Sequence, residues 1–249
     1  MAKDSKKDQK KILIEANNGK KYLVKDLAEN YHTSFGIISS KDLKGKNSRI
    51  KSSTGKTFLL LDATFPDLWE QFQRGPQIML QKDIGLIMAK TGINKDSEIV
   101  DAGGGSGSLC LSLANICKKI TVYETHPEHH KVVQKNIVLS GLTNVTLKHD
   151  DIYKGIKEKE LDLITLDLPE PWQVIKHAEK SLKDGGYLVI YLPNLTQMQK
   201  SLASLKGAPF KVLDIIELLE RKWAINEQIM RPEFQMLGHT GFMAFCRKL

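Results

Sequence analysis

The sequence has little cysteine and no long apolar run. Its three cysteines, Cys110, Cys117 and Cys246, have no spacing typical of metal ligands, and their odd number argues against a disulfide framework. No stretch approaches the roughly 20 apolar residues that a membrane-spanning helix requires. The lysine-rich start, MAKDSKKDQKK, also lacks the apolar segment of a secretory signal. We therefore expect buried thiols, no metal, no membrane partner and a cytoplasmic protein; a disulfide stays open for a hyperthermophilic source.

Positive charge is concentrated at the start of the chain. Of the 249 residues, 41% are hydrophobic and 27% are charged, which is ordinary globular composition and ample for a buried core. Residues 1–56 hold 13 lysines and one arginine against six acids, so they carry the whole net charge of +8. A basic module joined to a neutral one suggests a polyanionic partner, and a solvated lysine surface is the alternative.

Two different patterns follow one another along the chain. Residues 11–62 contain short strand-like runs at 11–15, 20–24, 35–39 and 57–62, and Asn17-Asn18-Gly19 between the first two is a hairpin signal. The pattern changes after Thr64. We therefore predict a small basic β-domain over residues 1–65, for RNA contact or oligomerisation, and a second domain over 66–249.

Strands and helices alternate in the second domain. Strands are predicted at 97–102, 119–124, 144–150, 161–167 and 185–193, and helices at 77–90, 108–118, 128–141, 172–182 and 194–205. This alternation predicts an α/β fold with a doubly wound, mostly parallel sheet. The strand-like segments at 210–225 and 240–249 have no clear helix between them, so they predict a terminal antiparallel hairpin.

Glycines gather directly after the first strand of this sheet. The run DAGGGSG, residues 101–107, opens a helix, and its glycines let the backbone turn sharply and approach a ligand closely. Ser108 and Leu109 stand where a dinucleotide fingerprint would end in Gly or Ala, and no Gly-Lys-Ser/Thr loop of an NTPase is present. The glycine run alone is a moderate signal, and a tight turn is the alternative.

Acidic residues stand at the ends of the next two strands. Glu124 follows Gly103 by 21 residues, where a carboxylate can accept both ribose hydroxyl hydrogen bonds. Asp150 or Asp151 at the end of the third strand could reach an adenine amino group. Because parallel strands deliver their carboxyl ends to one crevice, these groups predict a nucleoside-like cofactor. Carboxylates near a cationic sulfonium favour S-adenosylmethionine (AdoMet).

With these residues in place, the chain resembles the class I AdoMet-dependent methyltransferases, and within them the tRNA (adenine-N1)-methyltransferases of the TrmI type. The matching stretches are RGPQIMLQKDIGLIM (74–88), DAGGGSGSL (101–109), DLPEPW (167–172), YLPNLTQMQ (191–199) and RPEFQMLGHTGFMAFCRK (231–248). The resemblance implies a Rossmann-like second domain, methylation of the T-loop adenine at tRNA position 58, and a homotetramer. Archaeal members share the short N-terminal module, and the neighbouring adenine 57 stays open as a second target.

The resemblance also implies roles for individual residues. It assigns the catalytic carboxylate to Asp167 and places Tyr191 beside the entering base. The cofactor would contact Gln77, Asp101, Gly103, Gly105, Ser106, Gly107, Ser108, Leu109, Glu124, Asp150, Asp151, Ile152 and Asp167. The substrate would contact Arg231, His239 and Thr240. From charge alone, we expect Arg231, Arg247 and Lys248 to contact tRNA phosphates, with the N-terminal lysines extending this basic track. Gln81-Lys82-Asp83 departs from the family's usual Pro-Lys-Asp, and Leu80 stands where an aromatic is common, so the detail of the pocket walls stays open.

Asp167 suits methylation at adenine N1. N1 already carries a lone pair, so no strong base is needed, and positive charge grows on the base during transfer. A carboxylate that accepts a hydrogen bond from the exocyclic amino group favours that charge. The alternative is that Asp167 merely caps a strand end. In the loop that follows, we expect Glu170 to be a solvated charge and Trp172 to anchor the chain in the core.

Three other functions fit the sequence less well. A protein (isoaspartyl) methyltransferase would keep the fold, but the basic module and DLPEPW argue against it. A non-catalytic tRNA-binding subunit is disfavoured by the intact glycine loop, Glu124 and Asp167. An adenine-N6 enzyme would more usually carry an Asn/Asp-Pro-Pro-aromatic loop, which the sequence lacks.

Overall fold

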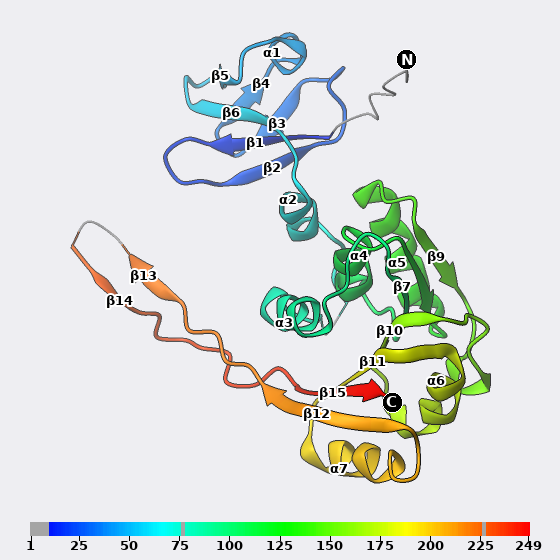
Figure 1. Cartoon of the computed structure of the whole chain (residues 1–249). Helices are drawn as coiled ribbons and strands as arrows, with labels where there is room; N and C mark the ends of the chain where they lie inside the picture. The colour runs from blue at the N-terminus through cyan, green and yellow to red at the C-terminus, as the bar shows by residue number, and fades with distance from the viewer. Residues whose placement is uncertain (1–9, 76–77, 226–227) are drawn as a thin grey trace. The chain divides into compact units, whose positions relative to one another are not determined.

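The computed structural model describes residues 10–75, 78–225 and 228–249, so Gln77 lies outside the described residues. The chain divides into two compact units, Met1–Phe72 and Gln73–Leu249, coloured blue to cyan and green to red in Figure 1. The boundary predicted at residue 65 falls at the start of helix α2 (Phe65–Glu70). This helix belongs to the first unit, where its Asp67 pairs with Lys21 at 2.9 Å.

The first unit is a small antiparallel β-structure. Its main sheet has the order β2-β1-β6-β5, formed by β1 (Lys11–Glu15), β2 (Lys21–Val24), β5 (Arg49–Lys51) and β6 (Thr57–Asp62). The hairpin of β3 (Tyr31–Thr33) and β4 (Gly36–Ile38) and the short helix α1 (Ser40–Lys44) complete it. The predicted turn between β1 and β2 is confirmed, since Gly19 has φ +71° and the Glu15 carboxylate accepts the backbone N–H groups of Asn17 and Asn18.

A seven-stranded sheet forms the centre of the second unit. Its order is β12-β15-β11-β10-β7-β8-β9, and β15 runs antiparallel to both neighbours while the other pairings are parallel. The predicted strands are confirmed as β7 (Glu98–Ala102), β8 (Lys119–Tyr123), β9 (Val145–Lys148), β10 (Leu161–Leu166) and β11 (Leu182–Leu192). The chain moves outward from β7 to β9 and then returns to place β10 on the other side of β7. This reversal creates the switch point at which α/β folds bind ligands.

Both faces of the sheet are covered. The helices are α3 (Gln81–Thr91), α4 (Ser108–Ala114), α5 (Pro127–Ser140), α6 (Ile175–Ser181) and α7 (Leu195–Ser204), with single turns η1 (Ile152–Lys154) and η2 (Pro171–Val174). Ile164 joins a core cluster that includes Ile175 of α6 and Met198 of α7, while Leu163 on the opposite face is equally buried. Helix α3 begins at Gln81 and not at 77 as predicted, because the backbone of Leu80 is extended.

The C-terminal hairpin is confirmed in part. β12 (Phe210–Glu217) and β15 (Phe242–Lys248) pair antiparallel, but the strand expected over 210–225 stops at Glu217. The short strands β13 (Trp223–Ile225) and β14 (Met230–Pro232) pair separately in an arm, residues 218–225 and 228–241, that extends away from the sheet in Figure 1. Within the described parts of the chain, no helix has the length and apolar character needed to cross a membrane.

Candidate active site

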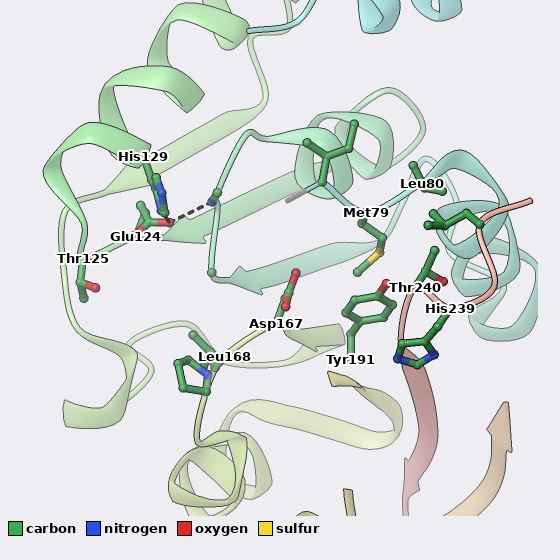
Figure 2. A pocket seen from close by; sticks show the side chains of 15 residues that line it. Met79, Leu80, Glu124, Thr125, His129, Asp167, Leu168, Tyr191, His239 and Thr240 are labelled. Carbon is green, nitrogen blue, oxygen red and sulfur yellow. Dashed lines mark hydrogen bonds and ion pairs between the residues drawn. The ribbon is translucent and has the colours of Figure 1, made fainter. Parts of the chain in front are cut away.

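A cavity of about 600 Å³ lies at the switch point, between the carboxyl ends of β7 and β10. The two ends meet closely: Asp167 N–H donates to the Ala102 carbonyl at 3.0 Å, and a Cβ on Gly103 would lie 2.1 Å from the Asp167 carbonyl oxygen. Gly103 also has φ +91°, so glycine is required there on both counts. Figure 2 shows this cavity. It is lined by Ile78, Met79, Leu80, Gly103, Gly105, Glu124, Thr125, His129, Asp167, Leu168, Pro169, Tyr191, Leu237, His239 and Thr240.

Glu124 holds the glycine loop in place. Its Oε2 accepts the Gly105 N–H at 2.9 Å, the dashed line in Figure 2, and its Oε1 accepts the His126 N–H at 2.7 Å. Each carboxylate oxygen has a further lone pair, so Glu124 can also accept hydroxyl donors from a ribose. His129 Nδ1 lies 3.9 Å from Oε2 on the same wall. The Glu124 carboxylate therefore joins the loop, the start of α5 and the cavity.

A second cavity of about 330 Å³ adjoins the first and shares Gly103, Glu124 and Pro169 with it. Asp150, Asp151 and Ile152 all line it. Asp151 accepts the Tyr153 N–H at 3.0 Å and so caps η1, whereas the Asp150 carboxylate accepts the Asp151 N–H at 2.9 Å. That N–H, with Lys157 at 3.2 Å, lowers the pKa of Asp150. Both residues line this cavity, so the geometry leaves the choice between them open.

The other residues of the glycine run have two roles: some line a small cavity, and others support the loop. Ser106, Ser108 and Leu109 line a small space of about 30 Å³ beside Gly103 and Asp167. Gly107 instead caps α4 with φ +82°. Asp101 lies beneath the loop, 1% exposed, and accepts a hydrogen bond from Thr165 Oγ1. It therefore supports the loop from below and does not face the cavity.

Asp167 projects into the cavity from the end of β10. The residue is exposed to solvent through the open cavity, but protein surrounds much of its carboxyl, and this partial desolvation, with the charge of Glu124, raises its pKa to about 6. Burial likewise raises the pKa of Asp101 to about 7. The loop behind Asp167 is braced, because Gln197 Nε2 donates to the Pro169 carbonyl at 2.9 Å and the Glu170 N–H donates to Tyr153 Oη at 3.2 Å. Asp167 is thus a carboxylate at neutral pH in a rigid setting.

Tyr191, His239 and Thr240 form the opposite wall (Figure 2). Tyr191, at the end of β11, is 6% exposed, and burial raises its pKa to about 12. His239 contacts Glu217 Oε1 at 2.6 Å and the Pro193 carbonyl at 2.7 Å, and the Glu217 carboxylate raises its pKa. With an acceptor at each ring nitrogen, His239 ties the arm to the ends of β11 and β12.

The predicted phosphate contacts lie elsewhere. Arg231 is on β14 in the arm, where its guanidinium stacks 3.8 Å from the Phe234 ring and donates to the Pro232 carbonyl. Arg247 donates to the Gly185 carbonyl and Lys248 to the Leu182 carbonyl. Because β15 runs antiparallel, these last two residues lie at the opposite end of the sheet from Asp167. These three residues therefore lie outside this cavity, and their contact with tRNA phosphates stays a prediction.

Several wall residues were not predicted from the sequence. Met79, Thr125, His129, Leu168 and Leu237 reach the cavity from loops or helix ends. Thr125 follows Glu124 directly, so a wider window around that strand end would have included it. Leu237 comes from the arm, whose course no local pattern indicates. Trp172, expected as a core anchor, is half-buried and has the Lys200 ammonium 3.9 Å from its ring.

The walls fit AdoMet. Glu124 suits the ribose hydroxyls, the cavity beside Ile152 joins an apolar side chain to carboxylates as an adenine needs, and Asp167 with Glu124 favours a cationic sulfonium. No group of three or more histidine, cysteine or acidic side chains that could hold a metal is present among the described residues.

Comparisons with known proteins agree with this geometry. A family model described as "tRNA methyltransferase complex GCD14 subunit" matches residues 57–233. The chain is 35% identical to the tRNA (adenine(57)-N(1)/adenine(58)-N(1))-methyltransferase TrmI of Methanocaldococcus jannaschii, over 95% of this chain and 94% of that protein.

Two solved structures resemble the whole chain. A SAM-dependent O-methyltransferase from Thermotoga maritima has a TM-score of 0.84 at 31% identity, covering 97% of this chain and 93% of that one. The tRNA (m1A58) methyltransferase TrmI from Aquifex aeolicus has a TM-score of 0.79 at 27% identity, covering 96% of each chain. The class I methyltransferase fold expected from the sequence is thereby confirmed, and this chain belongs to the GCD14 family of tRNA methyltransferase subunits.

Proposed function

We propose that this chain transfers a methyl group from AdoMet to N1 of adenine 58 in the T loop of tRNA. The observation that carries the proposal is the position of Asp167, which lies in the cavity between Glu124 and the wall formed by Tyr191 and Thr240 (Figure 2). The family model and the M. jannaschii relative, whose name gives the same atom, support it. Because that name also includes adenine 57, this neighbour is the second position to test.

Asp167 would orient the base and stabilise its growing charge. AdoMet supplies an electrophilic methyl group on a sulfonium when it is bound. The Asp167 carboxylate accepts a hydrogen bond from the exocyclic amino group, which turns the N1 lone pair toward the methyl group and offsets positive charge on the ring. In a water-poor pocket such an interaction is worth a few kcal/mol, on the order of 10²-fold in rate. The raised pKa of about 6 leaves Asp167 ionised at neutral pH, as this role needs.

The charge of the cavity favours a base over an acid as acceptor. An isoaspartyl or other carboxylate substrate would bring a negative charge beside Asp167 and Glu124, both on the wall. Like charges in a partly buried site raise each other's pKa and weaken binding. Adenine instead offers an amino donor to Asp167 and becomes cationic as it reacts. The electrostatics therefore support nucleobase methylation more than O-methylation.

We further propose that the protein acts as a homotetramer on tRNA in the cytoplasm, with each tRNA contacting more than one subunit. The target base lies in a folded region of tRNA and must leave its stack to reach Asp167. Residues 1–56 carry the net positive charge that would attract phosphates. The arm exposes several large apolar side chains, which suits a subunit contact; among them are Trp223, Ile225, Met230 and Phe234.

Methylation of unmodified tRNA decides the proposal. Purified protein, labelled AdoMet and a tRNA transcript are incubated, and the product is digested and mapped by mass spectrometry. We expect 1-methyladenosine at position 58, and tRNA with guanine at 57 and 58 should accept no label there. Transfer to protein or to small molecules with none to tRNA would contradict it, and light scattering with and without tRNA tests the tetramer.

A further inference from the structure

The arm joins the sheet through a short neck. The ladder of β12 and β15 ends at Glu217 opposite Phe242, and the next paired strands along the arm are β13 and β14. Residues 218–221 and 234–241, which we call the neck, belong to no strand in the part of the chain that the structure describes. The neck nevertheless supplies three residues that line the active-site cavity, Leu237, His239 and Thr240. The substrate-facing wall is therefore built from segments that lie outside the β-ladders.

Lys82, at the start of α3, binds both sides of this neck. Its side chain is 9% exposed, and its Nζ lies 2.7 Å from each of Asp83 Oδ1, the Leu218 carbonyl oxygen and Thr240 Oγ1. An ammonium has three N–H donors, and these three acceptors use all of them. Lys82 therefore joins α3 to the outgoing and the returning side of the neck and has no donor left for a ligand.

His239 makes a second connection at the neck. Its Nδ1 lies 2.6 Å from Glu217 Oε1, and its Nε2 lies 2.7 Å from the Pro193 carbonyl oxygen. A carboxylate and a carbonyl oxygen only accept hydrogen bonds, so both ring nitrogens donate and the ring is an imidazolium. The Phe242 ring packs beside it, with the two centroids 4.9 Å apart. Although His239 lines the cavity, both of its donors are already used.

The groups around His239 favour the cation. The hydrogen bond with the Glu217 carboxylate of β12 is the main cause that raises the pKa of His239, and the Pro193 carbonyl after β11 adds to it. Partial burial and the Lys82 ammonium of α3 act in the opposite direction, but the Lys82 charge is itself paired with Asp83. The net shift is upward, so the folded protein stabilises the imidazolium.

We propose that Lys82 and His239 are positioning residues that fix the neck of the arm as the substrate-facing wall of the cavity. This rests on the proposed function, since the wall that they hold faces the base. Lys82 spans Leu218 and Thr240, and His239 ties the neighbouring Glu217 to the returning chain, so the two cations continue the junction where the ladder ends. They act on the binding of tRNA and not of AdoMet, because Glu124 holds the glycine loop independently.

Limited trypsin digestion tests the fixing of the neck without any substrate. Arg221 is an exposed residue of the neck, and cleavage after it requires local opening of a segment that Lys82 and His239 hold at its root. We expect Lys82→Met and His239→Phe to speed this cleavage by about tenfold, the size of one hydrogen bond. Cleavage after Lys95, an 87% exposed residue before β7, is the reference within each digest and should not change.

Kinetics test the consequence for the substrate. Methyl transfer is measured over a range of tRNA concentrations, and AdoMet affinity by calorimetry. We expect Lys82→Met and His239→Phe each to raise KM for tRNA by about tenfold, with kcat within about threefold and AdoMet affinity within about twofold of the wild type. KM changes more than kcat because the wall contacts the base equally before and during methyl transfer. The double variant should lose less than the product of the two effects, since both residues fix one neck.

The pH profile tests the cation itself. KM of the wild type for tRNA should rise as the pH rises through the pKa of His239, because the ring then loses one of its two donors. Glu217→Gln keeps an acceptor for His239 but removes the charge that raises its pKa, so in this variant KM should begin to rise at a lower pH. AdoMet affinity should show no such shift between the two proteins.

Lys90→Met is the matched control. Lys90 lies on the same helix as Lys82 and pairs with Asp214 of β12 at 2.5 Å, so its loss removes another link between α3 and the terminal hairpin. We expect wild-type KM and wild-type cleavage from it. Lys82→Met leaves the fully buried Asp83 without its ion pair, whereas Glu217 is 34% exposed and tolerates the loss of His239. If Lys82→Met does not fold, His239→Phe and Glu217→Gln carry the test.

The outcomes separate this proposal from the function on which it rests. A wild type that does not methylate tRNA overturns the proposed function, and trypsin cleavage still reports on the neck. An active wild type in which either Lys82→Met or His239→Phe matches Lys90→Met overturns the proposal. A raised KM in His239→Phe with unchanged cleavage after Arg221 would show that His239 contacts the base directly, and would overturn it too. A pH profile of Glu217→Gln that coincides with that of the wild type does the same.

Discussion

The two sides of the cavity are held in different ways. On the cofactor side, the glycine loop is fixed by backbone groups close in sequence, since Glu124 accepts N–H groups from Gly105 and His126. On the base side, Tyr191 packs against Gly241 at the end of the arm, and the neighbouring Thr240 is held by Lys82 from a segment 158 residues away. A nucleoside cofactor can therefore be bound by a local motif, whereas the wall facing the substrate exists only when the arm is docked on α3.

Removing the Asp167 side chain should have the largest effect on the rate of methyl transfer, because this residue lies between the cofactor and the substrate base. We expect Asp167→Ala to lower the rate of methyl transfer to tRNA by about 10²-fold or more, since the growing charge on the base loses its acceptor. AdoMet should still bind, because the glycine loop and Glu124 remain. Single-turnover rates and calorimetry measure the two effects separately.

Asp96→Ala is the control for this change. Asp96 is a 78% exposed carboxylate on the loop that precedes β7, at the far end of the strand from the cavity. The Asp96→Ala variant should transfer methyl groups to tRNA at the wild-type rate. Loss of AdoMet binding in Asp167→Ala would show that Asp167 serves only to bind the cofactor. It would contradict the proposal that Asp167 acts on the substrate base.

Adding a methyl group at Gly103 should distort the glycine loop and so abolish AdoMet binding. Its Cβ would collide with the Asp167 carbonyl oxygen at 2.1 Å, and the backbone has φ +91°. We expect Gly103→Ala to lower the free energy of unfolding by about 3 kcal/mol, the sum of a left-handed backbone and an overpacked contact. AdoMet binding should be lost with it. Urea denaturation and calorimetry are the measurements.

Gly92→Ala separates the two causes. Gly92 also has positive φ, +64° at the end of α3, but a Cβ there meets nothing within 4 Å. It should cost about 1 kcal/mol of unfolding free energy from the backbone alone and leave AdoMet affinity intact. Equal losses in the two variants would mean that the approach of Asp167 to the loop contributes nothing.

The difference between the cofactor side and the base side also explains which features of the site could be predicted from the sequence. The glycine run, Glu124 and Asp167 stand at strand ends, and strand ends of a doubly wound sheet meet in one crevice, so local pattern and topology were enough to bring them together. Leu237 reaches the base side from the arm, and Lys82 of α3 holds Thr240 across 158 residues, so no periodic pattern in the sequence indicates either position. The strand expected to run to 225 stops at Glu217, because the arm leaves the sheet there, and Arg231 remains a predicted tRNA contact on that arm.

The smallest expected effect concerns pH and stability. The pKa of Asp167 is about 6 in the folded protein against a usual 3.8, so the folded state holds this proton more tightly than the unfolded state does. Ionising Asp167 therefore costs the fold stability as the pH rises from about 4 to about 6, and the cost stays constant above that. Asp167→Asn removes the charge, so its stability relative to the wild type should rise between about pH 4 and about pH 6 and stay level above that.

Thermal melts of Asp167→Asn and wild type at several pH values measure this difference, with Asp96→Asn as the control that should show no such trend. Methyl transfer by the wild type should move the other way, falling below pH 6 as the catalytic carboxylate becomes protonated. Ionisation of Asp167 therefore increases the rate of methyl transfer but lowers the stability of the folded protein. A stability difference independent of pH would mean that water reaches Asp167 freely, and that the cavity is not the low-dielectric site on which its catalytic role depends.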